Sequence, residues 1–147
     1  MEAIGAALAR SASAEACIIY LTGQLAAGKT TLARGFVRSC GHEGAVKSPT
    51  FTLVESYSLS ACVIHHFDLY RINAPEELEY VGIEDYFESG AMVLVEWSER
   101  GLGVIGAADL EIHLTVDGTS RAVDLEARSE RGKSVLQVFN SIYGSCS

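Results

Sequence analysis

The chain has 147 residues, of which 48% are hydrophobic and 20% are charged, a composition that excludes a disordered tail. This length predicts a single domain, residues 1–147, with little room for a separate substrate domain. Eleven basic against 19 acidic residues give a formal net charge of -8, the wrong sign for direct tight binding to nucleic acid.

The first third of the chain predicts a helix, a strand and a second helix. Residues 2–13 place apolar side chains on one side of a short helix. The apolar run 17–21 is rich in strand formers and predicts a strand buried on both faces. Helical spacing over residues 30–40 predicts the second helix, and Gly41 stands where a helix C-cap belongs.

The middle of the chain predicts a pair of strands followed by a helix. Residues 51–59 and 62–67 are rich in Val, Thr, Tyr, Phe and Ile, which favours two strands that both run toward Asp68. The short Ser60-Ala61 connection between them allows a hairpin. Residues 73–77 combine a capping residue, an early proline and first-turn acids, which predicts a helix start. Gly82 is expected to break that helix.

The last third predicts a strand, a loop, a hairpin and a closing helix. Residues 91–95 are wholly apolar and predict a buried strand, and residues 98–108 predict a loop. Alternating apolar positions over 110–116 and 123–127 predict an antiparallel hairpin, and residues 134–143 predict a helix.

Cysteine spacing and terminal composition give expectations about compartment. The four cysteines lie far apart without a C-x-x-C pair, which favours reduced core thiols over a zinc site or a redox dithiol. No apolar run reaches membrane-spanning length, and the N-terminal segment lacks a basic leader region. We expect a cytoplasmic protein with no membrane association.

One motif carries chemistry. The string GQLAAGKT at residues 23–30 matches G-x-x-x-x-G-K-[ST] and lies between a predicted strand and a predicted helix, the context of a phosphate-binding P-loop. Its glycines let backbone N–H groups surround phosphate oxygens, its lysine brings positive charge, and its threonine hydroxyl is placed to bind Mg²⁺. The expected nucleotide-binding residues are Gly23, Leu25, Ala26, Ala27, Gly28, Lys29, Thr30 and, more weakly, Thr31.

Hydrolysis needs a second metal-binding carboxylate and a group that orients water. Asp68 and Glu96 each follow an apolar strand, so both are expected at the phosphate-bearing edge of the sheet. Adjacent His65 and His66 point to opposite faces of a strand and cannot jointly bind a metal, so packing or hydrogen bonding is the preferred interpretation. Arg71 is one of two arginines considered as a source of transition-state charge, the other being Arg100.

With these residues in view, the chain resembles the TsaE (YjeE) family of P-loop ATPases. The resemblance rests on four motifs in the family's order and spacing: GQLAAGKTTLARGF, VKSPTFTLVESY, HHFDLYRINAPEELEYVGIEDYF and LVEW. It covers nearly the whole chain. It implies an α/β fold of the P-loop NTPase type, a three-layer sandwich whose central sheet is mostly parallel with antiparallel additions.

The resemblance also implies a function. Family members bind ATP and Mg²⁺ and support threonylcarbamoyl modification of adenosine 37 in tRNA, acting on the TsaB–TsaD heterodimer. By the same resemblance, Thr50 lies near the γ-phosphate, Asp68 is the Walker B-like acid and Glu96 is a Mg²⁺ contact. Which of these two acids holds metal (together with Thr30) and which orients water stays open, so Lys29, Asp68 and Glu96 are all expected to be catalytic. The loop departs from the family pattern at Gln24 and Ala26, where relatives usually carry an acid and glycine.

Two alternatives remain at this point. A small-molecule or nucleoside P-loop kinase shares the GKTTL string, but no arginine-rich lid is evident. A nucleotide-dependent binding switch with negligible hydrolysis would share the P-loop and differ only in turnover. A translation-type GTPase is weaker, because the chain has no N-K-x-D string.

Overall fold

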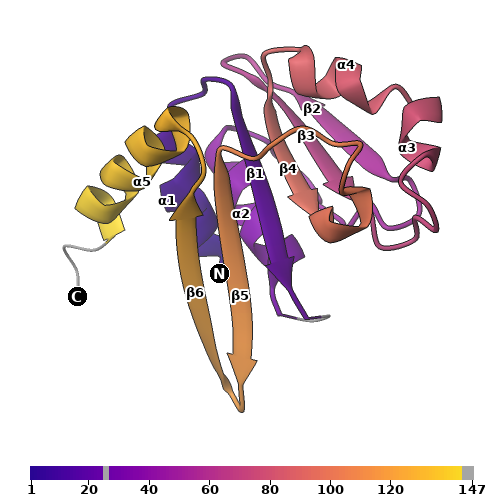
Figure 1. Ribbon diagram of the computed structural model, residues 1–147. Helices are drawn as coiled ribbons and strands as arrows, with labels where there is room; N and C mark the ends of the chain where they lie inside the picture. The colour runs from indigo at the N-terminus through magenta and orange to yellow at the C-terminus, as the bar shows by residue number, and fades with distance from the viewer. Residues whose placement is uncertain (25–26, 144–147) are drawn as a thin grey trace.

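Helices lie on both faces of a mixed sheet in the computed structural model, which describes residues 1–24 and 27–143 (Figure 1). The strands of the described chain are β1 (Cys17–Gly23), β2 (Val54–Ser58), β3 (Val63–Asp68), β4 (Met92–Glu96), β5 (Leu110–Asp117) and β6 (Ser120–Ala127). The helices are α1 (Glu2–Ala12), α2 (Lys29–Ser39), α3 (Glu77–Tyr80), α4 (Ile83–Glu88) and α5 (Glu130–Tyr143), with a 3₁₀ helix, η1 (Ser98–Gly101).

The sheet is parallel at its centre and antiparallel at its edges. Its strand order is β2-β3-β4-β1-β5-β6. Strands β3, β4, β1 and β5 pair in parallel, whereas β2 pairs antiparallel to β3 and β6 pairs antiparallel to β5. All five residues of β4 are buried, as expected for a parallel strand covered on both faces. The predicted α/β fold, with its mostly parallel sheet and antiparallel additions, is confirmed.

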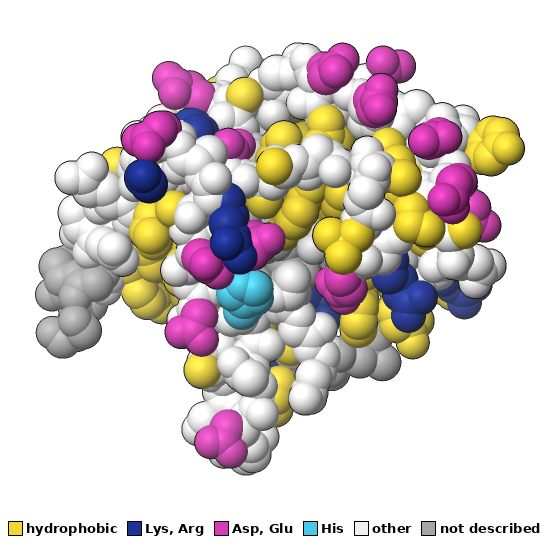
Figure 2. All heavy atoms as spheres, in the orientation of Figure 1, with side chains coloured by type: hydrophobic (Ala, Val, Ile, Leu, Met, Phe, Trp, Pro, Cys, Tyr) yellow, Lys and Arg dark blue, Asp and Glu magenta, His cyan; other side chains and the backbone are white. Residues whose placement is uncertain are grey.

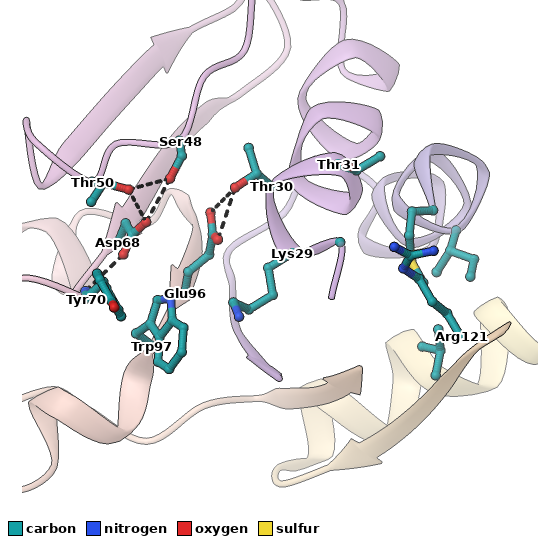
Figure 3. Close-up of a pocket in the computed structure, with 14 residues that line it drawn as sticks. Lys29, Thr30, Thr31, Ser48, Thr50, Asp68, Tyr70, Glu96, Trp97 and Arg121 are labelled. Atoms are coloured by element: carbon teal, nitrogen blue, oxygen red, sulfur yellow. Dashed lines mark hydrogen bonds between the residues drawn. The ribbon is translucent and has the colours of Figure 1, made fainter. Parts of the chain in front are cut away.

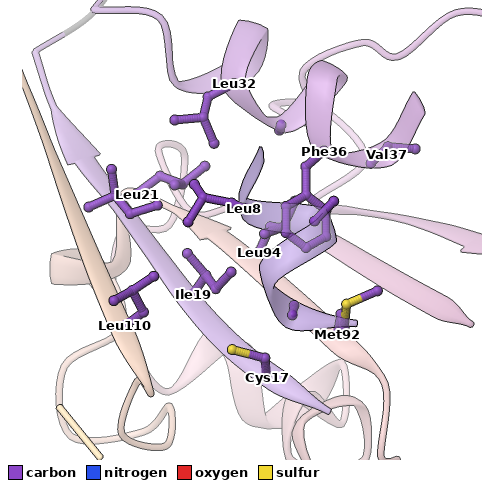
Figure 4. Close-up of a cluster of buried hydrophobic side chains, with 14 of the residues drawn as sticks. Leu8, Cys17, Ile19, Leu21, Leu32, Phe36, Val37, Met92, Leu94 and Leu110 are labelled. Carbon is purple, nitrogen blue, oxygen red and sulfur yellow. The ribbon is translucent and has the colours of Figure 1, made fainter. Parts of the chain in front are cut away.

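Two apolar cores flank the sheet because successive strand residues point to opposite faces. Ile19 and Leu21 pack with α1, α2 and α5, and Figure 4 shows Leu8 and Phe36 converging on the same core. Tyr20, between Ile19 and Leu21, faces the smaller core under α3 and α4. Because of this alternation, only every second side chain of a strand faces α2, and this holds also at the strand ends.

Helix α1 lies directly against α2. Gly35 makes this approach feasible, because a Cβ on Gly35 would lie only 2.1 Å from the Glu2 carbonyl oxygen. The crossing brings the N-terminal end of α1 to the start of α2, where Met1 packs against Gly28. The first residues of the chain therefore contribute to the surroundings of the P-loop.

One predicted strand was too long at its start. Strand β2 begins at Val54, not at residue 51. Leu53 has a positive φ of 72° and donates its backbone N–H to the Pro49 carbonyl oxygen at 2.8 Å, so residues 49–53 form a turn. Strands β2 and β3 do pair as an antiparallel hairpin, but only β3 runs toward Asp68. Strand β2 starts at Val54, opposite Phe67, and runs away from Asp68, so the prediction that both strands run toward it was wrong.

Helix boundaries also differ from the predictions. Helix α3 begins only at Glu77, whose carboxylate accepts the N–H groups of residues 73 and 74, and Gly82 separates α3 from α4 as expected. Residues 98–101 form η1 within the predicted loop. Helix α5 starts at Glu130, because the Ser129 hydroxyl accepts the Gly132 N–H at 3.0 Å and caps it earlier than the apolar spacing indicated.

The cysteines of the described chain are free. Cys17 is buried, and Cys40 and Cys62 are partly buried, while Cys146 lies outside the described residues. Among the described residues, none of the helices combines the length and apolarity needed to cross a lipid bilayer.

Burial of Cys17 predicts a loss of stability in alkali. Burial raises the pKa of the Cys17 thiol from 9.0 to about 12, with the Asp109 carboxylate adding to the effect. Above pH 9 the unfolded chain releases this proton while the folded chain retains it, so the free energy of unfolding should fall as the pH rises toward 12. Urea unfolding at several pH values would measure the slope. Cys17→Ala should make that slope shallower without removing it, because burial also raises the pKa of Cys40 to about 12.

Candidate functional site

The phosphate-binding loop connects the end of β1 to the start of α2. Gly28 is the residue before α2 and has a φ of 108°, a left-handed conformation that favours glycine. Its carbonyl oxygen accepts the Leu32 N–H at 2.9 Å, which starts the helical hydrogen-bond pattern. Leu25 and Ala26, two of the expected nucleotide-binding residues, lie outside the described residues.

A cavity of about 770 Å³ opens beside this loop. Figure 3 shows its walls, which come from the P-loop helix, the ends of β3 and β4, the segment before β2, α1 and β6. It is lined by Met1, Ile4, Gly28, Lys29, Thr30, Thr31, Ser48, Thr50, Asp68, Tyr70, Glu96, Trp97, Arg121 and Val123. Its volume falls within the range of small-molecule and cofactor sites.

Lys29 is buried and lies above an aromatic ring. Its Nζ donates to the carbonyl oxygens of Gly23 and Gln24, at 2.6 and 2.9 Å, and lies 4.2 Å from the centre of the Trp97 ring. Burial lowers the pKa of Lys29, and the nearby Glu96, Glu99 and Asp68 carboxylates oppose that shift. The ammonium group is therefore held beside the loop by carbonyl dipoles and the π face of an indole.

Trp97 follows β4 in an unusual backbone conformation. Its φ is 59°, in the left-handed region, and it precedes η1 directly. Such a conformation costs about 1–3 kcal/mol in a bulky residue and persists where the surroundings require it. Here it places the indole between Lys29 and the Tyr70 ring, whose centre lies 4.9 Å away.

Glu96 and Thr30 form the centre of the site. Glu96 is buried at the end of β4, and the Thr30 hydroxyl lies 3.2 Å from both of its carboxylate oxygens (Figure 3). Asp68 ends the neighbouring strand β3 and is the register partner of Glu96. Both acids therefore lie at the carboxyl ends of neighbouring strands, and both side chains are on the face of the sheet that α2 covers.

Asp68 holds a second set of partners. Its Oδ2 accepts hydrogen bonds from the hydroxyls of Ser48 and Thr50, at 2.8 and 2.9 Å, and its Oδ1 accepts the Tyr70 backbone N–H at 2.9 Å. Figure 3 shows these side chains on the opposite side of Glu96 from the P-loop helix. Asp68 thus ties the segment before β2 to the end of β3.

The other end of the cavity has a different character. Met1 and Ile4 of α1 and Val123 of β6 are apolar, and Arg121 lies beside them. In Figure 3 Arg121 and Thr31 lie on the far side of the P-loop from Asp68. The cavity therefore runs from a carboxylate-rich end to a mainly apolar end.

A family model described as "Threonylcarbamoyl adenosine biosynthesis protein TsaE" matches residues 1–123, which include every residue that lines the cavity. The chain belongs to the TsaE family.

Relatives and a solved structure agree with this assignment. The chain is 46% identical over 127 residues to the tRNA threonylcarbamoyladenosine biosynthesis protein TsaE of Haemophilus influenzae, covering 86% of this chain and 80% of that protein. It is 38% identical over 81 residues to the protein of that name in Bacillus subtilis, covering 55% and 50% of the two chains. A crystal structure of Bacillus subtilis YdiB superposes with a TM-score of 0.80 at 26% identity, covering 96% and 87%.

Seven of the expected site residues line the cavity of this TsaE-family chain: Gly28, Lys29, Thr30, Thr31, Thr50, Asp68 and Glu96. Four other described ones do not, namely Gly23, Ala27, Arg71 and Arg100, and Ala27 is fully buried. The Arg71 guanidinium lies 4.1 Å from the centre of the exposed Phe51 ring, and the Arg100 guanidinium lies 5.3 Å from that of Tyr70. Neither arginine lines the cavity. The roles of the others stay predictions.

Among the contributions missed from the sequence, three lie next to Lys29 and the two acids. Ser48 shares Asp68 with Thr50, Trp97 lies beneath Lys29, and His66 contacts Glu96. The S-P-T string offered a signal for Ser48, since its hydroxyl is two residues from Thr50. No pattern in the sequence reports which side chain a buried histidine meets.

The donor set of this TsaE-family site fits Mg²⁺. Thr30, Glu96 and Asp68 offer hydroxyl and carboxylate oxygens, which are the hard ligands that Mg²⁺ prefers, and none of the thiols that the structure describes lines the cavity. The cavity leaves room for the phosphates and waters that usually complete magnesium coordination. Thr30 with Glu96 would hold the ion most directly, since their oxygens already adjoin.

Proposed function

We propose that this chain binds ATP with Mg²⁺, hydrolyses it weakly when alone, and supports threonylcarbamoyl modification of tRNA adenosine 37. One observation carries the proposal: Lys29 and Thr30 of the P-loop share one cavity with the strand-end acids Asp68 and Glu96. A P-loop supplies phosphate binding, and the two acids supply the groups that hydrolysis requires in addition.

The character of the cavity supports a direction for the nucleotide. The triphosphate would lie at the end that holds Lys29, Thr30 and Asp68, with the N-terminal end of α2 adding its positive dipole. The base and ribose would lie toward Met1, Ile4 and Val123, whose apolar side chains suit a flat heterocycle.

Each residue has a task in this proposal. Lys29 balances charge on the β- and γ-phosphates, and Thr30 with Glu96 holds the metal. A bound Mg²⁺ would supply charge neutralisation of the phosphate oxygens. Asp68, with Ser48 and Thr50, orders the segment beside the γ-phosphate and orients the attacking water. The sequence positions of Asp68 and Glu96 alone did not indicate which acid holds the metal and which orients the water.

The acidic surface supports a protein partner over RNA. Figure 2 shows Asp and Glu side chains gathered over α3 and α4. This segment contributes Glu76, Glu77, Glu79, Glu84, Asp85 and Glu88, and the sequence holds no Lys or Arg from Ile72 to Glu99. Tyr80 stands among them with 92% of its surface exposed. Such a face repels phosphates and complements a basic protein surface, and we propose TsaB–TsaD as that partner. We further propose that residues 1–147 form one domain and that the protein is cytoplasmic. The free thiols of the described chain are compatible with the reducing conditions of the cytoplasm.

A reconstitution tests the whole proposal. The chain would be mixed with purified TsaB–TsaD, tRNA, threonylcarbamoyl donor and either ATP or a non-hydrolysable analogue, and modified tRNA would be counted over many turnovers. We expect ATP-dependent complex formation and sustained modification only with hydrolysable ATP. If the analogue supported binding and modification as well as ATP does, the chain would act as a nucleotide-dependent switch and not as an ATPase. If phosphate were transferred to a metabolite, the chain would be a kinase.

A further inference from the structure

His66 is a buried polar residue next to the proposed metal site. It lies on β3, and its Nε2 is 2.6 Å from Glu96 Oε2 on β4. The two side chains are 0% and 3% exposed, so neither exchanges this contact for water. The neighbouring His65 faces the other side of the sheet, where its Nδ1 contacts the Ser56 hydroxyl at 2.7 Å.

The chemistry of the pair sets the direction of the hydrogen bond. An ionised carboxylate only accepts, so His66 Nε2 carries the hydrogen and donates it to Oε2. Its Nδ1 is buried and has no hydrogen-bond partner among the described residues. An unpaired acceptor there is better tolerated than an unpaired donor, which favours hydrogen on Nε2 over hydrogen on Nδ1.

This bond restricts the carboxylate that meets Thr30. Glu96 Oε2 is engaged by His66, and the Thr30 hydroxyl lies 3.2 Å from Oε1 and Oε2 alike. Rotation of the carboxylate would break the contact with His66, so Oε1 is held toward Thr30 and the cavity. Asp68 has no such partner and is held instead by hydroxyls and a backbone N–H.

We propose that His66 is a positioning residue, which orients the Glu96 carboxylate toward Mg²⁺ by donating a hydrogen bond from Nε2 to Oε2. This inference rests on the proposed function, because it assigns His66 to the same metal site. Partners that orient ligating groups in this way contribute about 10–100-fold to metal affinity.

The test compares two substitutions by their need for Mg²⁺. His66→Leu removes the donor, whereas His66→Gln retains an N–H donor near the position of Nε2. Binding of a fluorescent ATP analogue would be titrated against Mg²⁺, a readout that does not depend on turnover. We expect His66→Leu to need about 10–100-fold more Mg²⁺ for half-saturation, and His66→Gln to restore most of the loss. His65→Leu is the matched control and should leave the Mg²⁺ requirement unchanged.

Two results would overturn the inference while leaving the proposed function in place. One is an unchanged Mg²⁺ requirement in folded His66→Leu. The other is an equal loss of nucleotide affinity with and without Mg²⁺, which would indicate a structural role. If the nucleotide affinity of the wild type did not depend on Mg²⁺, the metal site itself would be overturned.

Nitrogen NMR of labelled histidine adds a test on the unaltered protein. Hydrogen on Nε2 of His66 supports the inference, and hydrogen on Nδ1 alone contradicts it.

Discussion

Lys29→Met is expected to lower ATP hydrolysis by about 10²–10³-fold, the usual cost of removing one preorganised group that stabilises transition-state charge. Methionine keeps a linear apolar side chain above the Trp97 ring but cannot balance charge on the β- and γ-phosphates. The carbonyl oxygens of Gly23 and Gln24 would also lose their shared donor. Phosphate release by protein purified free of other ATPases would measure the effect.

The control for this variant is Lys133→Met. Lys133 is an exposed lysine of α5 that pairs with Glu130 at 3.0 Å, far in sequence from the P-loop. We expect wild-type hydrolysis from it, and circular dichroism should show that both variants fold. Substantial phosphate release by folded Lys29→Met would refute the assignment of this cavity to ATP.

Glu96→Gln and Asp68→Asn are expected to fail in different ways. Glu96→Gln removes the negative charge beside Thr30, so nucleotide binding should need at least about tenfold more Mg²⁺. Asp68→Asn removes the charge that holds Ser48 and Thr50, so it should slow hydrolysis by about 10²-fold while Mg²⁺-dependent binding persists. Metal titrations of nucleotide binding and single-turnover phosphate release separate the two effects.

Glu88→Gln serves as the control for both substitutions, since Glu88 is an exposed acid at the end of α4. It should match the wild type in both assays. If Asp68→Asn shifted the Mg²⁺ requirement and Glu96→Gln did not, the two roles would have to be exchanged. Equal shifts in both would mean that the acids share the metal.

Elements with a strong local signal were predicted well from the sequence. The continuous apolar runs of β1 and β4 reflect burial on both faces. The alternation in β5 and β6 reflects strands with one face toward the core and the other toward solvent. The turn before β2 was missed because it depends on a positive φ at Leu53, a residue with no preference for that conformation. The early start of α5 depends on a cap by Ser129, which the apolar spacing does not report.

The parts of the site that lie at the ends of strands could be predicted from the sequence. Because parallel strands end at a common edge, Asp68 and Glu96 were both expected at that edge. Their register pairing, which makes them direct neighbours, is seen only in the structure. The contact of His66 with Glu96 depends on the alignment of β3 with β4, two strands joined through α3 and α4. Local patterns carry no information about that alignment. The contributions of Met1 and Val123 to the cavity were missed for the same reason.

The pairing of Asp68 with Glu96 also makes the site a check on the folding of the sheet. If β4 aligned one residue out of step with its neighbours, Glu96 would point toward the face covered by α3 and α4, away from Thr30. A misaligned molecule would remain compact and would keep its P-loop sequence, yet it would lack the metal response. An assay of magnesium-dependent nucleotide binding therefore measures the fraction of molecules in which β4 is correctly aligned. It would detect a misalignment that measurements of helix content do not detect.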